Sequence, residues 1–252
     1  MKIFFEFGNT RIKAALLDNR NNYDFLGAVD KQHVSTGEFI QLLGLDDIEE
    51  QVTQVYFCSV TSASDNAYLI ESIKELFKCY PTELRSEPRC CDVESGYDHF
   101  EQLGVDRWMS IIGASAGSSK PVIVVSLGTA MTIDAVVDKK HLGGFIVPGL
   151  SLMRRSLALN TAQLDEYDLP SQQNEFKLLA TNTENAILGG TLYMAASYIN
   201  SLIKDLENET GRKFDCVGTG GDFSAVEPLL DKSFLYIEDL TLKGMVKVVE
   251  SF

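Results

Sequence analysis

Two short stretches of this chain share one pattern, and that pattern constrains the fold more than any other feature. Residues 4–17 and residues 124–137 each contain an apolar run, one polar residue, one apolar residue, a glycine, a small polar tip and a second apolar run. Because each run has the length of a strand, each stretch is predicted to form a tight β-hairpin around Gly8 or Gly128. Glycine lets the backbone approach a ligand closely, and N–H groups at such a turn can hold a phosphate. Two such loops in corresponding places predict a duplicated fold that binds one nucleotide between its halves.

The composition fits a folded protein and argues against several kinds of partner. Of 252 residues, 45% are apolar and 23% are charged, which is typical of a globular chain with one large or two small domains. The net charge of −14 argues against non-specific binding to nucleic acid or to anionic membranes, and no apolar stretch looks long enough to span a bilayer. The N-terminus enters a strand directly, without the pattern of a leader. We therefore expect a cytoplasmic protein without nucleic-acid or membrane partners.

The cysteines do not indicate a disulfide framework. Their number is odd, and no secretory leader is recognised. Cys90 and Cys91 are adjacent but lack the spacing of a zinc knuckle, and His33, His99 and His141 are scattered. A metal site near this pair is the less favoured interpretation, and reduced, unbound thiols are the favoured one.

The chain is predicted to divide near residues 118–121, a short polar segment before a strongly strand-like run. The expected elements of the first half, residues 1–118, are the hairpin at 3–17, strands at 23–29 and 54–60, and helices at 37–43, at 65–77 and within 102–117. The second half, residues 119–252, repeats the hairpin. Its other expected elements are a glycine-rich loop at 141–150, an exposed loop at 160–177, a helix at 185–206, a strand leading into the loop 218–222, a strand at 235–237 and a helix at 240–249. This order predicts an α/β protein with two related halves.

The polar residues of the hairpins could bind a phosphate group and its metal ion. Glu6 could hold Mg²⁺ through water, the tip at residues 8–10 could donate hydrogen bonds, and Lys13 could neutralise phosphate charge. Thr129 is the corresponding candidate for a phosphate contact in the second hairpin. Ordinary turns, which favour Asn and Gly, explain the first motif about equally well when it is taken alone. Its recurrence in the second half favours the functional interpretation.

A third motif, at residues 103–108, places an acidic residue beside a basic one ahead of a helix. Asp106 could act as a general base for phosphoryl transfer to an alcohol, and Arg107 would suit a substrate that carries a carboxylate. The alternative is that Asp106 only caps the helix. Trp108 is more typical of a core than of a ligand contact. The loop at 218–221 could lie against a nucleotide or be a simple strand-to-helix turn.

Six motifs occur in an order that resembles the type III pantothenate kinase family, over nearly the whole chain. They are Gly8-Asn9-Thr10-x-x-Lys13, Tyr97-x₅-Leu103-Gly104-Val105-Asp106-Arg107-Trp108, Gly128-Thr129-Ala130-x-Thr132-x-Asp134, Gly143-Gly144-x-Ile146-x-Pro148-Gly149, Thr183-x-x-Ala186-Ile187-x-x-Gly190 and Thr219-Gly220-Gly221.

The resemblance implies a fold, a reaction and a set of site residues. The fold would be two duplicated ribonuclease-H-like halves of the acetate and sugar kinase/Hsp70/actin superfamily, assembled as a homodimer. The reaction would be the ATP-dependent phosphorylation of pantothenate that begins coenzyme A synthesis. The implied ATP-binding residues are Glu6, Phe7, Gly8, Asn9, Thr10, Arg11, Ile12 and Lys13, with Thr129. The implied substrate-binding residues are Tyr97, Gly104, Val105, Asp106, Arg107 and Thr183, and Asp106 is the implied proton acceptor.

Two positions depart from the usual residues of that family, which has Asp where this chain has Glu6 and Ser126. The first Asp is associated with metal and phosphate positioning, and the second with a monovalent cation, K⁺ or NH₄⁺. Glu6 keeps the charge but moves it outward by one methylene, whereas Ser126 leaves only a hydroxyl and backbone carbonyls. The departures could indicate shifted metal use or weakened activity.

Two further functions are therefore considered beside the kinase. A catalytically impaired homologue with a binding or regulatory role is suggested by Glu6 and Ser126, but the intact Asp106, Arg107 and Thr129 argue against it. A phosphatase or sugar kinase on the same fold is disfavoured because the segment 103–108 is so particular.

Overall fold

The computed structural model describes residues 1–34, 37–115, 118–168 and 178–252. The chain forms two compact units, which are described separately. The first unit contains Met1–Ser118, Lys139–His141 and Asp239–Phe252, and the second contains Ser119–Asp138 and Leu142–Glu238. The units therefore differ from continuous halves of 1–118 and 119–252, because the C-terminal helix and a short turn segment belong to the first unit.

Five strands form the sheet of the first unit, in the order β3-β2-β1-β4-β5. Their bounds are β1 Lys2–Phe7, β2 Arg11–Leu17, β3 Tyr23–Asp30, β4 Gln54–Ser59 and β5 Thr82–Glu83. The first three strands run antiparallel, whereas β4 is parallel to β1 and β5 is parallel to β4. The register sets Glu6 between Lys13 on β2 and Cys58 on β4, so three reactive side chains share one row of the sheet.

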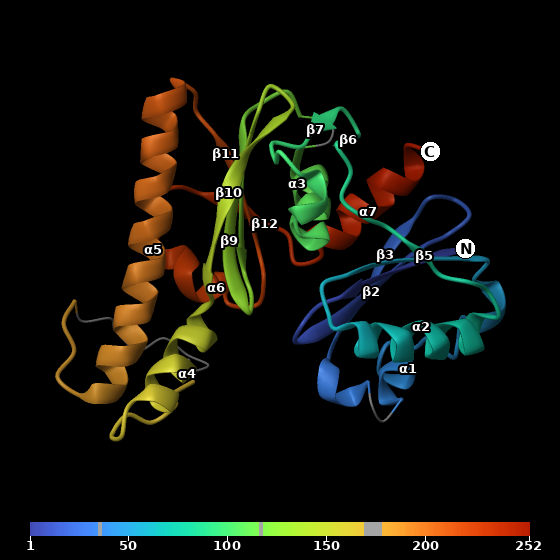
Figure 1. Cartoon of the computed structure of the whole chain (residues 1–252), viewed down its shortest axis with the longest axis horizontal. Coiled ribbons are helices and arrows are strands. Elements are labelled where there is room, and N and C mark those ends of the chain that lie inside the picture. Colours follow the sequence, from blue (N-terminus) through green and yellow to red (C-terminus); the bar gives the residue numbers. More distant parts are fainter. Residues whose placement is uncertain (35–36, 116–117, 169–177) are drawn as a thin grey trace. The chain divides into compact units, whose positions relative to one another are not determined.

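Helices cover both faces of this sheet (Figure 1). The helical segments are η1 Lys31–His33, α1 Glu38–Leu42, η2 Glu49–Gln51, α2 Ala63–Phe77, η3 Phe100–Gln102, α3 Val105–Ser115 and α7 Leu240–Glu250, and a small hairpin is formed by β6 Arg89–Cys90 and β7 Val93–Glu94. Leu69, Ile73 and Phe77 recur every fourth residue along α2, and this apolar stripe packs on one face of the sheet. On the other face, the Cys58 thiol contacts Met245 of α7 at 3.5 Å.

Two glycines allow α3 and α7 to cross in direct backbone contact. A Cβ atom on Gly244 would lie 1.8 Å from the Met109 carbonyl oxygen, and one on Gly113 would lie 2.6 Å from the Leu240 carbonyl oxygen. No larger residue fits at either position without moving a helix, because backbone atoms cannot yield as a flexible side chain can. The C-terminal helix thereby fixes the position of α3, which begins with the predicted substrate segment.

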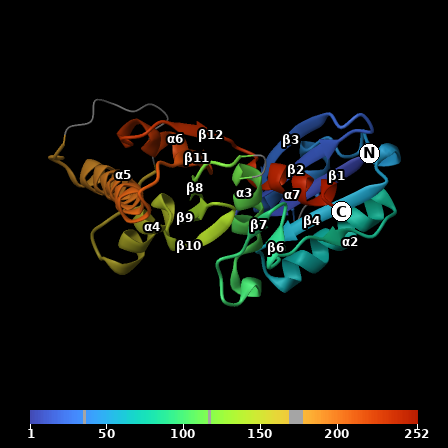
Figure 2. The ribbon, with the colours of Figure 1, turned by 90° about the horizontal axis from the view of Figure 1, so that it is seen from above.

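The second unit repeats the strand order of the first. Its strands are β8 Val122–Leu127, β9 Ala130–Val137, β10 Lys140–Pro148, β11 Asp215–Thr219 and β12 Phe234–Tyr236. They are arranged as β10-β9-β8-β11-β12, which matches β3-β2-β1-β4-β5 strand for strand (Figure 2). The hairpin β8–β9 is antiparallel, and β11 is parallel to both β8 and β12. The predicted α/β fold of two duplicated halves is confirmed.

The helices of the second unit are α4 Leu150–Asn160, α5 Thr183–Thr210, the short α6 Phe223–Val226 and η4 Glu227–Leu229. Leu192, Ala195, Ile199 and Ile203 of α5 lie in the core of this unit with residues of β8 and β9. By length and composition α5 could also cross a membrane, since its most apolar window has a mean hydropathy of 1.3. The expectation that no apolar stretch is long enough to span a bilayer was therefore wrong. Of that window 44% is buried in the fold, and core helices have the same composition.

The sequence located most elements but not α4. The segment at 141–150, predicted to be a loop, forms most of strand β10 and then the start of α4, and its Gly143 takes up a positive φ of 115° within the strand. The outward side of α4 carries exposed leucines, Leu152, Leu157 and Leu159, which obscure the helical pattern of buried and polar residues. Of the predicted loop at 160–177, residues 161–168 have no helix or strand, and 169–177 lie outside the described residues.

Candidate active site

The first hairpin carries a partly buried ion pair. Glu6 and Lys13 face each other across β1 and β2, with Lys13 Nζ 3.2 Å from Glu6 Oε2. The Lys13 side chain is 18% exposed and the Glu6 side chain is 15% exposed. Glu6 Oε2 is buried and accepts no well-directed hydrogen bond, so its contact with Lys13 is a charge pairing. A carboxylate oxygen with free acceptor capacity suits a metal ion or a metal-bound water.

The turn between these strands is built from backbone. The N–H of Gly8 donates to the Arg11 carbonyl at 3.0 Å, and a Cβ atom on Gly8 would lie 2.8 Å from the same oxygen. Asn9 and Thr10 are exposed at the tip, where they can reach a ligand. Phe7 and Ile12, also predicted to bind the nucleotide, are each 1% exposed in the core, so any contact they make must come from backbone.

Arg11 points elsewhere in this structure. Its Nε lies 3.2 Å from Asp30 Oδ1, and both side chains are about half exposed. An exposed pair of this kind contributes little to stability, so Arg11 can leave it at low cost.

Asp106 lies in the first turn of α3, where its Oδ1 accepts a hydrogen bond of 2.8 Å from the Arg107 backbone N–H. Burial raises its pKa, the Arg107 N–H partly offsets that rise, and the negative charge of Glu6 adds to it. A Cβ atom on Gly104 would lie 2.8 Å from Asp106 Oδ1, so the glycine leaves room for the carboxylate. A carboxylate made more basic by burial is suited to accept a proton.

Arg107 and Tyr97 form a second cluster with His141, although the histidines are scattered in the sequence. Arg107 is 5% exposed, and its Nη1 donates to the Tyr97 hydroxyl at 2.8 Å. The Tyr97 ring stacks on the fully buried His141 ring, with centroids 5.9 Å apart and planes 13° from parallel. No sequence motif identified His141, because its place beside Tyr97 depends on the turn segment 139–141 joining the first unit.

The second hairpin lies where several backbone segments meet. The Gly149 N–H donates to the Thr129 carbonyl at 3.0 Å, and a Cβ atom on Gly149 would lie 2.1 Å from the Gly128 carbonyl oxygen, so the N-terminus of α4 is held against the hairpin tip. The loop after β11 is equally close, since a Cβ atom on Gly220 would lie 2.3 Å from the Leu127 carbonyl oxygen. Ser126 is half-buried and Thr129 is exposed at this junction.

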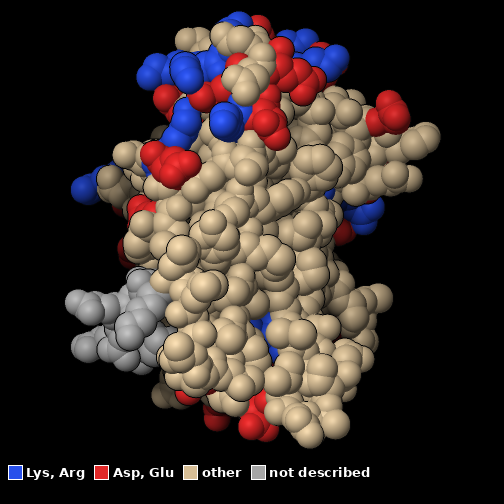
Figure 3. All heavy atoms as spheres, turned by 90° about the vertical axis from the view of Figure 1, so that its left-hand side faces the viewer, with Lys and Arg blue, Asp and Glu red and all other residues tan. Residues whose placement is uncertain are grey.

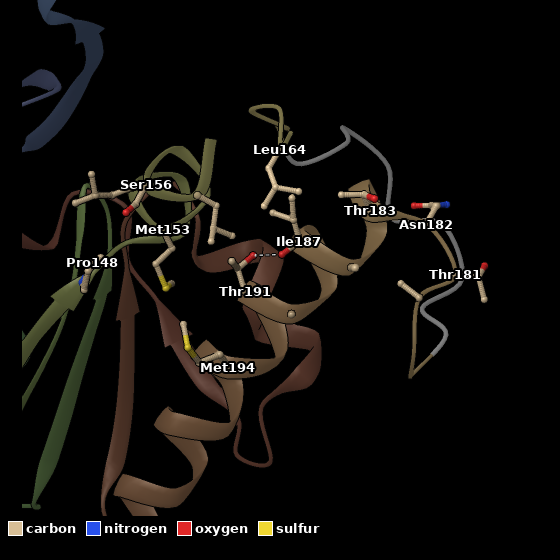
Figure 4. Close-up of a pocket in the computed structure, with 15 residues that line it drawn as sticks. Pro148, Met153, Ser156, Leu164, Thr181, Asn182, Thr183, Ile187, Thr191 and Met194 are labelled. Carbon is tan, nitrogen blue, oxygen red and sulfur yellow. Dashed lines mark hydrogen bonds between the residues drawn. The ribbon is translucent and has the colours of Figure 1, made fainter. Parts of the chain in front are cut away.

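A cavity of about 1150 Å³ lies between α4 and α5 of the second unit (Figure 4). Met153, Ile187 and Met194 give it largely apolar walls, and Thr183 lies at the N-terminus of α5, where the Asn182 side chain caps the helix. Thr191 donates its hydroxyl hydrogen to the Ile187 carbonyl at 3.0 Å, so it does not present a free donor to the cavity.

The structure thus gathers the predicted residues into groups within each unit. Glu6, Lys13, Asp106, Arg107 and Tyr97 belong to the first unit, and Ser126, Thr129 and Thr183 to the second. In the described parts of the chain no three His, Cys, Asp or Glu side chains come together as a metal site. A divalent ion at Glu6 would therefore take its other ligands from phosphate and water, which is how Mg²⁺ is commonly held.

Comparisons with known proteins show which family the chain belongs to. The family model of the type III pantothenate kinases matches residues 2–205. A type III pantothenate kinase of Hydrogenovibrio crunogenus is 55% identical over 251 residues, covering 100% of both chains. One of Nitrosococcus oceani is 30% identical over 256 residues, covering 99% of this chain and 94% of its own.

Solved structures at low identity show the fold alone. A putative 2-dehydro-3-deoxygalactonokinase of Sinorhizobium meliloti has a TM-score of 0.61 at 11% identity, covering 99% of this chain and 98% of that one. A putative Baf family transcriptional activator of Campylobacter jejuni has a TM-score of 0.59 at 18% identity, covering 98% and 97%. The chain shares the fold of these solved structures, and it belongs to the type III pantothenate kinase family.

Proposed function

We propose that this protein transfers a phosphoryl group from ATP to the primary hydroxyl of pantothenate and so carries out the first step of coenzyme A biosynthesis. The observation that carries the proposal is the full-length identity of 55% to a type III pantothenate kinase. An impaired homologue with a regulatory role is not favoured, because Asp106 keeps the surroundings of a general base. We place the enzyme in the cytoplasm, without nucleic-acid or membrane partners.

Asp106 is the proposed proton acceptor. Its raised pKa makes the carboxylate a better base than an exposed Asp, while leaving it ionised when the pH lies above that pKa. A positioned base of this kind contributes about 10²–10⁴-fold to the rate. The N-terminal end of α3 holds the carboxylate in one place through the Arg107 N–H, which limits the reorganisation needed at the moment of reaction.

Glu6 and Lys13 are proposed to position the phosphates of ATP together with the hairpin tip at residues 8–10. The residues present fit a divalent ion, because Glu6 Oε2 has unused acceptor capacity. Mg²⁺ bound there would neutralise charge on the phosphates and on the group being transferred. Before ATP binds, the Lys13 ammonium partly neutralises the negative charge of Glu6. When ATP is bound, Lys13 can pair with a phosphate oxygen. Thr129 is the proposed ATP contact of the second hairpin.

Arg107 and Tyr97 are proposed to hold the substrate. A buried guanidinium presents a rigid fork of donors that suits a carboxylate, which pantothenate carries. One fork nitrogen is fixed by the Tyr97 hydroxyl, and the guanidinium carbon lies 5.6 Å from the centre of that ring. His141 stacks on the tyrosine ring and is therefore proposed as a positioning residue. Gly104, Val105 and Thr183 complete the proposed substrate contacts.

We also propose that the protein is a homodimer joined through α4 and α5. The face formed by these helices is nearly free of charged side chains except at its ends (Figure 3). Tyr193 and Met194 of α5 are 59% and 51% exposed, and Leu152 of α4 is 44% exposed. A contiguous apolar surface of this kind is rare on a monomer and typical of a protein interface.

The first test is a coupled assay with and without pantothenate. The protein should consume ATP only when pantothenate is present, and Asp106→Asn should lower kcat by about 10²–10⁴-fold. Because burial penalises the charged carboxylate, the Asn variant should be as stable as the parent protein or more so. In the parent, kcat should fall as the pH drops through the raised pKa of Asp106.

The matched control is Asp98→Asn, which removes an exposed carboxylate from the same unit and should leave kcat unchanged. Absence of phosphopantothenate by mass spectrometry, across Mg²⁺ and Mn²⁺ concentrations, would overturn the kinase proposal. Near-normal turnover of Asp106→Asn would show that Asp106 is not the proton acceptor and at most contacts the substrate.

His141→Ala should raise KM for pantothenate by about 2- to 10-fold, the value of one aromatic pair, and leave KM for ATP nearly unchanged. His141→Phe keeps a stacked ring and should restore most of the pantothenate KM. Steady-state kinetics with each substrate varied gives the comparison. His99→Ala, at an exposed histidine, is the control. An equal rise of both KM values in the Ala variant would contradict a positioning role.

Replacing Na⁺ by K⁺ or NH₄⁺ should change the rate of the natural protein little, because Ser126 offers no charge for a monovalent cation. Ser126→Asp should create a K⁺ dependence by adding a hard oxygen ligand. The control Ser119→Asp places the same charge at an exposed site of the second unit, and it should not create a K⁺ dependence. Strong activation of the unmodified protein by K⁺ would show that the serine hydroxyl and backbone carbonyls are sufficient ligands for the cation, and it would contradict this prediction.

Light scattering should give the mass of a dimer at micromolar concentration. Met194→Glu should produce a monomer, because it buries a charge in the proposed interface. Leu42→Glu makes the same kind of change at a leucine that is 56% exposed in the first unit, and it should leave the dimer intact. A monomeric parent protein, or equal effects of the two variants, would remove the α4–α5 face as the interface.

A further inference from the structure

Cys90 and Cys91 present their thiols to the same side of a tight turn between β6 and β7. Side chains of successive strand residues normally point to opposite faces. Here Cys91 and Asp92 have left-handed φ angles of 49° and 67°, which turn the Cys91 side chain back toward Cys90. The two sulfur atoms are 3.6 Å apart. Cys90 is 8% exposed and Cys91 is half-buried, so the pair lies at the surface with one thiol covered.

The pair faces the last turn of α7. The Cys91 thiol donates to the Lys247 carbonyl oxygen at 3.4 Å, and Cys90 Sγ is 3.8 Å from the Ser251 hydroxyl. The final carbonyls of a helix have no partner within the helix, and the helix dipole places partial negative charge there. Two sulfur atoms and two oxygen atoms therefore surround the C-terminal end of α7, where a cation is favoured.

The spacing of the sulfur atoms favours one bridging atom over a direct disulfide bond. A disulfide needs sulfur atoms about 2.05 Å apart and Cα atoms at least about 4.4 Å apart. Adjacent residues have Cα atoms only about 3.8 Å apart, so a disulfide would be strained. Two thiolates on one tetrahedral ion with bonds of about 2.3 Å lie about 3.8 Å apart, close to the observed separation.

Two charged side chains, Glu87 and Lys247, lie near the pair. Burial raises the pKa of Cys90 to about 11, the Cys91 thiol adds to that rise, and Glu87 contributes as well. Burial lowers the pKa of Lys247, while the Cys91 thiol raises it and Lys139 lowers it further. The Lys247 ammonium donates to the Gly113 carbonyl at 2.9 Å.

We propose that Cys90 and Cys91 bind one thiophilic divalent cation of the Zn²⁺ and Cd²⁺ class. Binding breaks two S–H bonds, forms two metal–sulfur bonds and releases two protons to solvent. The Lys247 carbonyl and the Ser251 hydroxyl are the available oxygen ligands, and water completes the coordination. In the described part of the chain no third His, Cys, Asp or Glu joins the pair, so the site is open on one side.

Titration with Cd²⁺ tests the site without reference to the kinase reaction. The ultraviolet charge-transfer absorption of thiolate bound to cadmium should saturate at one Cd²⁺ ion per chain. About two protons should be released per ion near neutral pH. Cys91→Ser should weaken Cd²⁺ binding at least about tenfold, because one thiolate is lost. Cys91 is half-buried, so its replacement by the similar serine should preserve the fold.

Cys79→Ser is the control, since it removes another half-buried thiol of the first unit. Thermal melting should rise with Cd²⁺ in the parent and in Cys79→Ser, but not in Cys91→Ser, because a ligand of the native state stabilises it. Equal Cd²⁺ affinity of the parent and Cys91→Ser would overturn the proposal. Loss of binding in Cys79→Ser alone would do the same.

Discussion

The ion pair of Glu6 and Lys13 is the interaction on which the chemistry proposed for the first unit depends. Burial raises the pKa of Asp106, and the negative charge of Glu6 adds to that rise, while Glu6 itself has Lys13 beside it. Lys13 compensates Glu6, so Glu6 suits metal and phosphate, while Asp106 is left more basic. Two similar side chains are thereby suited to the different roles proposed for them, because their surroundings differ.

The position of Asp106 depends in turn on packing far from it in sequence. Gly113 and Gly244 allow α3 and α7 to touch through their backbones, so the last helix of the chain fixes the helix that carries Asp106 and Arg107. The segment 139–141 adds a further support, because the Lys139 ammonium donates to the Ser115 carbonyl at the end of α3. A change in the C-terminal helix can therefore alter the site without touching a ligand.

Duplication explains why the two hairpins look alike and why they are no longer equivalent. Each unit has the same strand order, and Glu6 and Ser126 occupy matching positions beside the central parallel strand. Glu6 faces Lys13 across its hairpin, whereas Ser126 faces Thr132. At this position one hairpin therefore has a pair of opposite charges, and the other has a pair of hydroxyl groups. The same backbone frame thus supports two hairpins of different charge.

The sequence by itself determined the duplicated α/β fold, the two hairpins and the family, because these depend on local patterns: apolar runs of strand length, glycines at turns and ordered motifs. It could not identify His141 or the α3–α7 crossing, since both join residues that are distant in sequence and leave no periodic signal. It also missed α4, whose exposed leucines hide the helical pattern. Only the tertiary structure decided which carboxylate is compensated and which is made basic, because burial and neighbouring charge arise when separate segments pack together.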